Sequence, residues 1–363
     1  SLIGGKGDDI LLGGTGRDLY YYRSGAGNDR IVDADGGIIV IHDENFDLYA
    51  PKLVSKEEFF SPGHRACQGC GEALAIRLMC KALGKDTVIT NATGCMEVIS
   101  SLYPTTAWNL PWIHVAFPNS AAVGSGVEAG LTALRRKGKI ADRRVKSVAI
   151  GGDGGTMDIG FQALSGAMER CHDMLYVCFD NEAYMNTGIQ RSSGTPFLAS
   201  TTTAPAGKKI HGNQVWKKNL PEIMVAHNVA YVATATPSYP IDFMNKVKKA
   251  RQIKGPSYIH CFVACPTGWR STSETCIKLG RLALETGLFP LYEVEDGKYR
   301  LTVEVPEKRR PIQDYLKGQG RFRHLTPDQI QVIQERVDIE WETLMIKVEH
   351  SRSKEALRAR RSR

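Results

Sequence analysis

The sequence predicts a large α/β domain built on a largely parallel sheet with flanking helices. From about residue 85, short apolar runs that resemble buried strands alternate with stretches of helical periodicity. Several of these runs pass directly into loops, as parallel strands do at the edge where α/β sheets bind ligands. With 363 residues, 42% of them hydrophobic, the chain is long enough to fill a large core.

This alternation places the elements in order along the chain. Strands that pass into loops are expected at 85–95, 145–155, 174–184 and 257–268. Helices are expected at 120–138, which ends at Gly138, and at 158–171, which is amphipathic. After about residue 285 the sequence is charged and less regular, with a further helix expected at 326–351.

The first 37 residues differ in composition from the rest of the chain. Their stretch GGKGDDILLGGTGRDLYYY resembles the repeats of RTX-type calcium-binding β-rolls, in which glycine makes tight turns and aspartate binds Ca²⁺. Asp8, Asp9 and Asp18 are the candidate ligands. Only about two repeats are present where about three are usually needed, so we expect weak calcium binding or none.

Three regions follow from these patterns. We expect a Gly/Asp-rich fragment and linker at 1–45, a main domain at 46–290, and a C-terminal extension with a basic helical tail at 291–363.

Charge and cysteine content narrow the class of protein. The formal net charge is +8, and much of the excess lies in the tail at 351–363, a solvated end that leaves an acidic protein partner open. No aromatic-interleaved basic patch accompanies it, which disfavours nucleic acid. No apolar run approaches the ~18 residues that span a bilayer, and the first residues lack a signal-peptide layout. Nine cysteines, an odd number, favour metal-bound thiolates in a reducing cytoplasm over a secreted disulfide framework.

A glycine-rich turn follows the strand expected at 145–155. Its residues GGDGG, 151–155, combine free backbone N–H groups with Asp153, which suits a diphosphate held through a divalent cation. After Gly154 come 26 residues and then Asn181, at the next strand end. With a backbone carbonyl near Ala183, these groups supply the oxygen ligands that Mg²⁺ prefers. The ordinary alternative is a strand–turn–helix followed by an incidental asparagine.

Four cysteines are candidates for a second metal site. Cys67 and Cys70 form a Cys-x₂-Cys pair, which alone suits zinc, a redox dithiol or an iron–sulfur cluster equally. Cys95 and Cys265 lie in loops at strand ends, so a parallel sheet would bring them to the same edge. The spacing C-x₂-C-x₂₄-C-x₁₆₉-C contains no histidine and no second close pair, which disfavours a zinc ribbon and fits a Cys₄ [4Fe–4S] cluster.

The other five cysteines have simpler interpretations. Cys261, expected inside a strand, and Cys276, expected in a later helix, are the alternatives for the fourth ligand. Cys80, Cys171 and Cys178 fall in predicted helix or strand interiors, where a buried free thiol is expected.

Several stretches together resemble the β subunits of pyruvate:ferredoxin oxidoreductases (pyruvate synthases), in the 2-oxoacid:ferredoxin oxidoreductase family. They are CQGCGE, NATGCMEV, SSLYPTTAWNLPWIHVAFPNSAAVGSG, GGDGGTMDIGFQALSGAMER, FDNEAYMNTGIQRSSGTP and CPTGW. The resemblance covers about residues 46–290 and implies a thiamine-diphosphate-binding fold there that also carries a [4Fe–4S] cluster.

The resemblance also assigns site residues. It implies cluster ligands Cys67, Cys70, Cys95 and Cys265, and magnesium held by Asp153, Asn181 and the carbonyl of Ala183. The implied contacts with thiamine diphosphate are Glu72, Cys95, Gly152, Asp153, Gly154, Gly155, Asn181, Glu182, Ala183, Tyr184, Met185 and Asn186. Glu72 and Asn186 would be catalytic, Glu72 against the cofactor and Asn186 toward the substrate. The ordinary alternatives are an acid at a helix N-terminus for Glu72 and a turn residue for Asn186.

The resemblance implies an activity and partners. The reaction is pyruvate, coenzyme A and oxidised ferredoxin to acetyl-CoA, CO₂ and reduced ferredoxin, in either direction. It needs α-, γ- and δ-type subunits, and the carboxylate that activates thiamine would come from the α subunit. The alternatives are another 2-oxoacid (phenylglyoxylate or a branched-chain acid), a non-catalytic iron–sulfur electron-transfer subunit, and a β-roll adhesion protein suggested only by residues 1–37.

Overall fold

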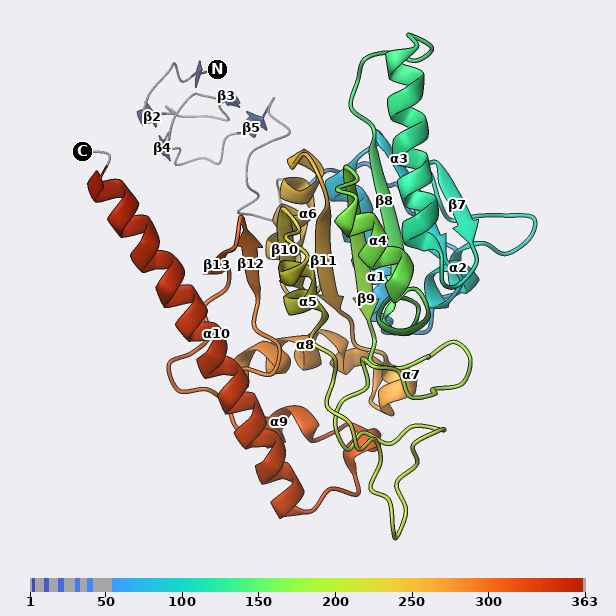
Figure 1. Ribbon diagram of the computed structural model, residues 1–363, viewed down its shortest axis with the longest axis vertical. Helices are drawn as coiled ribbons and strands as arrows, with labels where there is room; N and C mark the ends of the chain where they lie inside the picture. Colours follow the sequence, from blue (N-terminus) through green and yellow to red (C-terminus); the bar gives the residue numbers. More distant parts are fainter. Residues whose placement is uncertain are drawn as a thin grey trace. The chain divides into compact units, whose positions relative to one another are not determined.

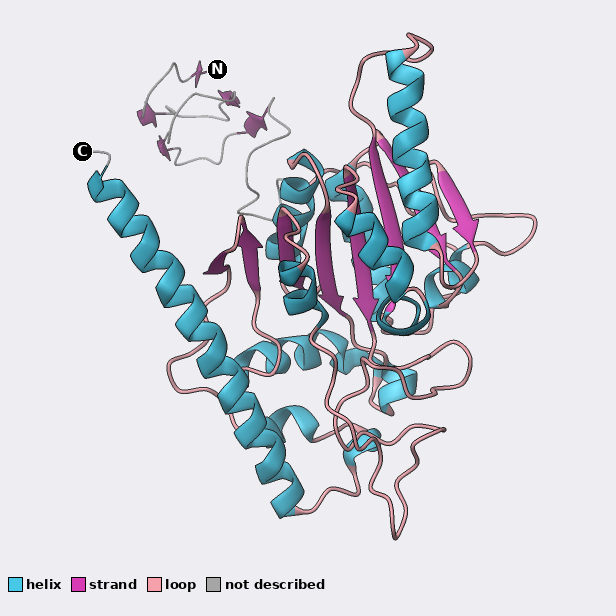
Figure 2. Cartoon of the chain, viewed as in Figure 1, coloured by secondary structure: helices cyan, strands magenta, loops and turns pink. Residues whose placement is uncertain are grey.

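The computed structural model describes residues 54–361 and, before them, five short strands at 2–3, 10–12, 19–22, 30–32 and 38–41. The chain divides into two compact units, Ser1–Pro51 and Lys52–Arg363 (Figures 1 and 2). Each unit is described here by itself.

The first unit contains two small parallel sheets. The strands are β1 (Leu2–Ile3), β2 (Ile10–Leu12), β3 (Leu19–Tyr22), β4 (Arg30–Val32) and β5 (Ile38–Ile41). β1, β3 and β5 form one sheet, and β2 and β4 form the other, so successive strands alternate between the two. The expected calcium ligands Asp8, Asp9 and Asp18 lie outside the described residues, and the likeness to calcium-binding repeats stays a prediction.

The second unit is built on an eight-stranded sheet with the order β13-β12-β10-β11-β9-β8-β6-β7. Its strands are β6 (Thr87–Ala92), β7 (Trp112–Val115), β8 (Lys146–Gly152), β9 (Met174–Asp180), β10 (Tyr231–Ala235), β11 (Ser257–Phe262), β12 (Tyr292–Glu295) and β13 (Lys298–Leu301). The six strands from β10 to β7 in this order are parallel, and the hairpin β12–β13 extends the sheet antiparallel to β10. The predicted α/β class is confirmed, and the sheet continues past residue 290, where a C-terminal extension was expected to begin.

Helices cover both faces of this sheet. They are α1 (Gly71–Leu83), α2 (Cys95–Ser100), α3 (Ser120–Arg136), α4 (Phe161–Glu169), α5 (Leu220–Ala226), α6 (Pro240–Gln252), α7 (Pro266–Trp269), α8 (Cys276–Glu285), α9 (Ile312–Leu316) and α10 (Pro327–Arg361). Helices α3 and α4 pack together over β8 on one face, while α1 and α6 pack together on the other (Figure 1). The strands between them are buried throughout; β9, for example, has no exposed residue.

Three local predictions need correction. The glycine turn expected after β8 is a π-helical turn, η2 (Gly154–Ile159), so α4 begins only at Phe161. Cys95 is not in a loop but is the first residue of α2. Cys171 is exposed and left-handed (φ 55°), just after α4, because the chain turns there toward β9. No described helix is both long enough and apolar enough to cross a membrane.

Candidate functional site: a metal–diphosphate edge beside four cysteines

The predicted site residues meet at one edge of the sheet. Strands β6, β8, β9 and β11 are parallel, so their carboxyl ends lie at the same edge. Asp153 follows β8 and Asn181 follows β9, while Cys95 and Cys265 come three residues after β6 and β11. Open α/β sheets bind their ligands at such an edge.

The side chains of Asn181 and Asp153 and the carbonyl group of Ala183 converge at one point. One terminal atom of the Asn181 side-chain amide lies 2.9 Å from the carbonyl oxygen of Ala183 and 3.1 Å from Oδ1 of Asp153. With the amide nitrogen in this position, both contacts are hydrogen bonds. With the amide oxygen there, three oxygens face one another with no proton between them. Neighbouring ligands of an octahedral Mg²⁺ at 2.0–2.1 Å are about 3 Å apart, so this oxygen-facing arrangement fits the ion.

Asp153 has the environment of a carboxylate that needs a cation. It is 1% exposed, and its Oδ2 accepts a hydrogen bond from the hydroxyl of Ser192. Burial and then the negative charge of Asp180 raise the pKa of Asp153 well above its usual range. A divalent cation would favour the charged form and offset this burial.

The side chain of Glu72, in the first turn of α1, also contacts Asn181. Its Oε2 accepts from the amide of Asn181 at 3.4 Å, while its buried Oε1 has no hydrogen-bond partner among the described residues. Burial raises the pKa of Glu72 to about 8. An unpartnered buried carboxyl oxygen beside Asn181 indicates space for a further polar group, which fits the predicted contact with a cofactor.

The glycines of the turn are packed closely. A Cβ atom on Gly154 would lie 2.3 Å from the ring of Tyr184, and one on Gly155 would lie 3.0 Å from the ring of Phe117. Tyr184 is fixed in turn, because its hydroxyl donates to Asp158 at 2.8 Å. The absence of side chains here therefore lets the loop after β9 lie directly on the turn after β8.

The loop from Tyr184 to Gln190 forms a tight turn at the site. Tyr184 and Gln190 are bridged, with Tyr184 N–H donating to Gln190 O at 2.9 Å. Met185 is partly buried beside Gly268, whereas Asn186 is exposed on the turn. The structure thus places Asn186 near the site but gives its side chain no contact that defines a role.

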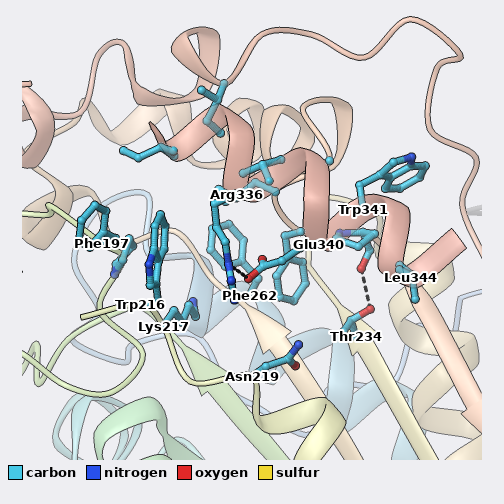
Figure 3. A pocket seen from close by; sticks show the side chains of 18 of the residues that line it. Phe197, Trp216, Lys217, Asn219, Thr234, Phe262, Arg336, Glu340, Trp341 and Leu344 are labelled. Carbon is cyan, nitrogen blue, oxygen red and sulfur yellow. Dashed lines mark hydrogen bonds and ion pairs between the residues drawn. The ribbon is translucent and has the colours of Figure 1, made fainter. Parts of the chain in front are cut away.

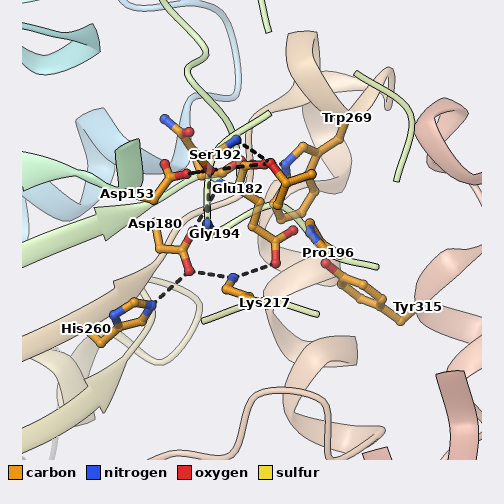
Figure 4. A network of polar contacts seen from close by, with 12 residues as sticks. Asp153, Asp180, Glu182, Ser192, Gly194, Pro196, Lys217, His260, Trp269 and Tyr315 are labelled. Atoms are coloured by element: carbon orange, nitrogen blue, oxygen red, sulfur yellow. Dashed lines mark hydrogen bonds and ion pairs between the residues drawn. The ribbon is translucent and has the colours of Figure 1, made fainter. Parts of the chain in front are cut away.

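The side chain of Glu182 belongs to a network of buried polar contacts (Figure 4). Its φ is +71°, an uncommon conformation for a residue with a side chain, which turns the chain between Asn181 and Ala183. Its carboxylate binds Lys217 at 2.8 Å and Arg321 at 2.5 Å. These ion pairs hold the unusual backbone conformation in place.

Lys217 binds Asp180 as well as Glu182, so it joins the residues that precede and follow Asn181 in the sequence. Its Nζ lies 2.5 Å from Asp180, and Asp180 also binds His260 at 2.8 Å (Figure 4). Burial alone would raise the pKa of Asp180, but Lys217 and His260 outweigh it and lower that pKa to about 2. Both neighbours of Asn181 are therefore buried and lie against basic side chains.

The cysteine pair at the start of α1 is attached to the segment after β11. Cys70 N–H donates to Cys67 O at 3.1 Å, and Gly71 N–H donates to Ala264 O at 3.1 Å. Cys265 begins α7, and its sulfur accepts from the N–H of Gly268 at 3.3 Å.

The four predicted cluster ligands lie within electrostatic reach of one another. Burial and then Glu72 raise the pKa of Cys70 to about 12, with a contribution from Cys265. The pKa of Cys95 is raised by burial and Glu72, and then by Cys265 and Cys70. Cys67 contributes to the raised pKa of Cys265, about 11, for which burial is the main cause.

The remaining cysteines are placed mainly as expected. All nine are free thiols; Cys261, Cys80 and Cys178 are buried in β11, α1 and β9. The pKa of Cys276 is raised by burial, with no contribution from another thiol. Cys265 contributes to the raised pKa values of Cys70 and Cys95, which supports it as the fourth ligand. Cys276 also lies close to the pair, since a Cβ atom on Gly71 would lie 3.1 Å from its sulfur. No three His, Cys, Asp or Glu in the described part of the chain are arranged to hold a single metal ion.

A cavity of about 360 Å³ is lined by Lys217 and Glu182. Phe197 and Trp216 stack with ring centres 4.2 Å apart on one wall, and α10 supplies another wall (Figure 3). The cavity and the candidate site therefore share Lys217 and Glu182.

Sequence reasoning did not identify the supporting residues Ser192, Lys217 and Arg321. Each comes from a different part of the chain, and Arg321 lies 139 residues from its partner Glu182. No local spacing signals such pairs. Trp269 belongs to the recognised CPTGW stretch, but its contact with Asn181 has no sequence signal either.

Comparison with known proteins identifies the family of the chain. The thiamine pyrophosphate enzyme family, through its C-terminal TPP binding domain, matches residues 92–261. Pyruvate synthase subunit PorB of Methanocaldococcus jannaschii is 60% identical over 284 residues, which cover 78% of this chain and 95% of that protein. Ketoisovalerate oxidoreductase subunit VorB of Pyrococcus abyssi is 48% identical over 289 residues, with coverages of 79% and 93%. A solved 2-oxoglutarate:ferredoxin oxidoreductase from Magnetococcus marinus matches with a TM-score of 0.48 and 20% identity, covering 63% of this chain and 82% of that one.

The fold and its matched domain define a thiamine pyrophosphate enzyme domain on an oxidoreductase subunit. Within that class, the chain belongs to the PorB family of pyruvate synthase subunits.

Proposed function

We propose that the chain is the thiamine-diphosphate- and [4Fe–4S]-bearing subunit of a pyruvate synthase. It would act in the conversion of pyruvate, coenzyme A and oxidised ferredoxin to acetyl-CoA, CO₂ and reduced ferredoxin, and in the reverse reaction. The observation that carries the proposal is the convergence of Asp153 Oδ1, the Ala183 carbonyl and one end of the Asn181 amide at the carboxyl edge of the sheet.

These three groups would hold Mg²⁺, and the ion would bind the diphosphate. The backbone N–H groups from Gly152 to Gly155 lie at the start of a helical turn, where they can donate to phosphate oxygens. When bound, thiamine diphosphate supplies an electron sink for cleavage of the bond between the keto carbon and the carboxylate. Glu72 would contact the cofactor through its buried carboxyl group, and Asn186, on the exposed turn, would face the substrate.

Cys67, Cys70, Cys95 and Cys265 would hold the [4Fe–4S] cluster beside the cofactor. Their mutual effects on thiol pKa support this, as does their position at the edge that carries Asp153. A one-electron acceptor at this place gives the electrons an exit toward ferredoxin. We therefore favour a catalytic subunit over an electron-transfer subunit without thiamine.

Pyruvate is the favoured substrate because the relative named for pyruvate synthase is 60% identical, against 48% for the relative named for ketoisovalerate. Both relatives are named as subunits, which supports action together with other chains of the same oxidoreductase. A branched-chain 2-oxoacid is the second candidate. Phenylglyoxylate has no comparable support.

Anaerobic EPR of the complete enzyme tests the proposal. A reduced [4Fe–4S] signal that needs pyruvate, and that ketoisovalerate produces much less well, is the expected result. A signal that appears with dithionite and with ketoisovalerate, but not with pyruvate, would reassign the substrate to ketoisovalerate. No iron signal under any reductant, in a preparation whose iron content is also negligible, would remove the cluster assignment.

A further inference from the structure

We propose that helix α7 couples the cysteine site to the metal–diphosphate site, with Trp269 as the positioning residue. Affinity for the metal would then depend on whether the cysteines hold their cluster. This inference rests on the function proposed above and adds a dependence of one site on the other.

Helix α7 lies between the two sites. It comprises Pro266–Trp269, with Cys265 immediately before it. A four-residue helix has little stability of its own, so the groups at its ends decide its position. At its start, Cys265 accepts hydrogen bonds at its sulfur from Gly268 N–H and at its carbonyl from Trp269 N–H, the latter at 2.9 Å.

The other end of α7 holds the metal-binding loop. Trp269 is fully buried, and its indole N–H donates to the main-chain carbonyl of Asn181 at 2.9 Å. Because Asn181 is one of the three proposed metal ligands, displacement of Trp269 would move that ligand directly.

The Trp269 ring also supports the next residue of that loop. The guanidinium of Arg321 stacks on the ring at 4.1 Å and binds Glu182, whose φ of +71° turns the chain toward Ala183. Trp269 therefore acts on the loop at two points, the Asn181 carbonyl and the Glu182 side chain.

A third contact joins α7 to the same loop. A Cβ atom on Gly268 would lie 2.1 Å from the sulfur of Met185, so the two segments touch with no intervening space. With Cys265 fixed on a cluster, α7 is held at both ends. Without the cluster its first end loses this covalent anchor and keeps only contacts such as the hydrogen bond from Gly71 N–H to Ala264 O, so the Trp269 contact with Asn181 weakens.

A double-mutant cycle on the complete enzyme tests this coupling. Mn²⁺, added with thiamine diphosphate to oxidised enzyme, replaces Mg²⁺ as the probe, and free Mn²⁺ is counted by EPR. We expect Cys265→Ser and Trp269→Phe each to raise the Mn²⁺ dissociation constant about 10-fold, in the range for loss of groups that support metal ligands. The double variant is expected to show about the same 10-fold loss, whereas independent effects would multiply to about 100-fold.

Trp108→Phe is the matched control. Trp108 is also buried and also donates its indole N–H to an oxygen, the hydroxyl of Ser100 at 2.8 Å. It is expected to leave Mn²⁺ affinity unchanged. An equal loss in Trp108→Phe would assign the effect to general destabilisation and overturn the inference.

The outcomes separate the coupling from the proposed function. A 100-fold loss in the double variant, with iron and Mn²⁺ present in the wild type, overturns the coupling and leaves the function standing. Wild-type enzyme without iron overturns the cluster assignment itself. If Trp269→Phe does not assemble, wild-type enzyme before and after oxidative removal of the cluster decides instead: an unchanged Mn²⁺ dissociation constant overturns the coupling.

Discussion

In the sequence Asn181 lies between Asp180 and Glu182, whose buried carboxylates bind basic side chains. The amide of Asn181 faces a third carboxyl group, that of Asp153. Lys217 and Arg321 pair with Asp180 and Glu182, so the carboxyl groups left to face the amide are those of Asp153 and, on the other side, Glu72. The carboxylates of Asp180 and Glu182 are thus occupied by ion pairs, whereas the side chain of Asn181 remains available to bind a cation.

Asn181→Ala tests this at the residue scale. Loss of the amide removes one proposed ligand, and we expect Mn²⁺ and thiamine diphosphate to bind at least about 10-fold more weakly, with the fold intact. Titration calorimetry of the complete enzyme measures this. Asn109→Ala, which removes an exposed amide that donates to Ser61, is the control and should bind both as the wild type does. Equal affinity in the Asn181 variant would contradict the metal site.

A pair of glycine substitutions tests the packing of the turn. Gly154→Ala places a methyl group against the Tyr184 ring, so we expect loss of thiamine diphosphate binding. Gly126→Ala, within α3, meets no atom within 4 Å and is expected to raise stability by up to about 1 kcal/mol without affecting binding. Thermal unfolding and cofactor titration measure both. Normal cofactor binding by Gly154→Ala would show that the ring can move aside.

The sequence allowed the proposed ligands to be predicted, but not the residues that support them. Asp153 and Asn181 follow predicted strands directly, so the parallel sheet alone brings them together. Lys217 and Arg321 come from irregular segments, and their positions depend on the complete tertiary fold. The exposed position of Cys171 was missed because a left-handed residue just after a helix resembles a helix interior in the sequence.

At the scale of elements, the edge opposite the site is held by a cluster of charges. Asp173, just before β9, binds Arg144 at 2.8 Å and Lys146 at 2.7 Å, and Lys146 also donates to the carbonyl of Ile253. The cluster thereby joins the start of β8, the turn before β9 and the turn after α6.

Asp173→Asn is expected to lower the free energy of unfolding at pH 7 by about 2 kcal/mol. This loss is smaller than that expected for a fully buried ion pair, because the carboxylate is 33% exposed. Burial alone would raise the pKa of Asp173, but Lys146 and Arg144 lower it overall. This contribution is therefore present above the unfolded-state pKa of about 3.9 and is lost as pH falls through the lower folded-state pKa. Denaturant unfolding at pH 7 and pH 3 measures the difference in free energy of unfolding between the wild type and the variant. This difference, the wild-type advantage, should be smaller at pH 3. The exposed Asp142→Asn is the control, and an equal advantage at both pH values would contradict the explanation.

The strands were predicted more accurately than the connections between them. A buried apolar run identifies β8 or β9 because local composition determines it. The π-helical turn η2 packs against Tyr184 and Phe117, which local composition does not record. The helical start at Cys95 was likewise missed, because its stretch was interpreted as the loop after a strand.

At the scale of the whole molecule, the two compact units predict separable behaviour. All the proposed ligands lie in the second unit, Lys52–Arg363. Removal of residues 1–51 is therefore expected to leave pyruvate-dependent cluster reduction and Mn²⁺ affinity unchanged within twofold, as measured by EPR on the assembled enzyme. Any effect of added Ca²⁺ on thermal unfolding should disappear with these residues. A loss of Mn²⁺ affinity on their removal would show that the first unit supports the site.

The long sequence separations within the site have a consequence for its biosynthesis. Glu72 contacts Asn181 across 109 residues, and Glu182 binds Arg321 across 139. A ribosome makes the chain from its N-terminus, so the cysteine pair at 67–70 is complete long before Arg321 exists. The contacts that hold the proposed ligands in place can therefore form only after nearly the whole second unit has been synthesised. The proposed site is thus completed late in translation, although its first candidate ligands are among the earliest residues of that unit to be made.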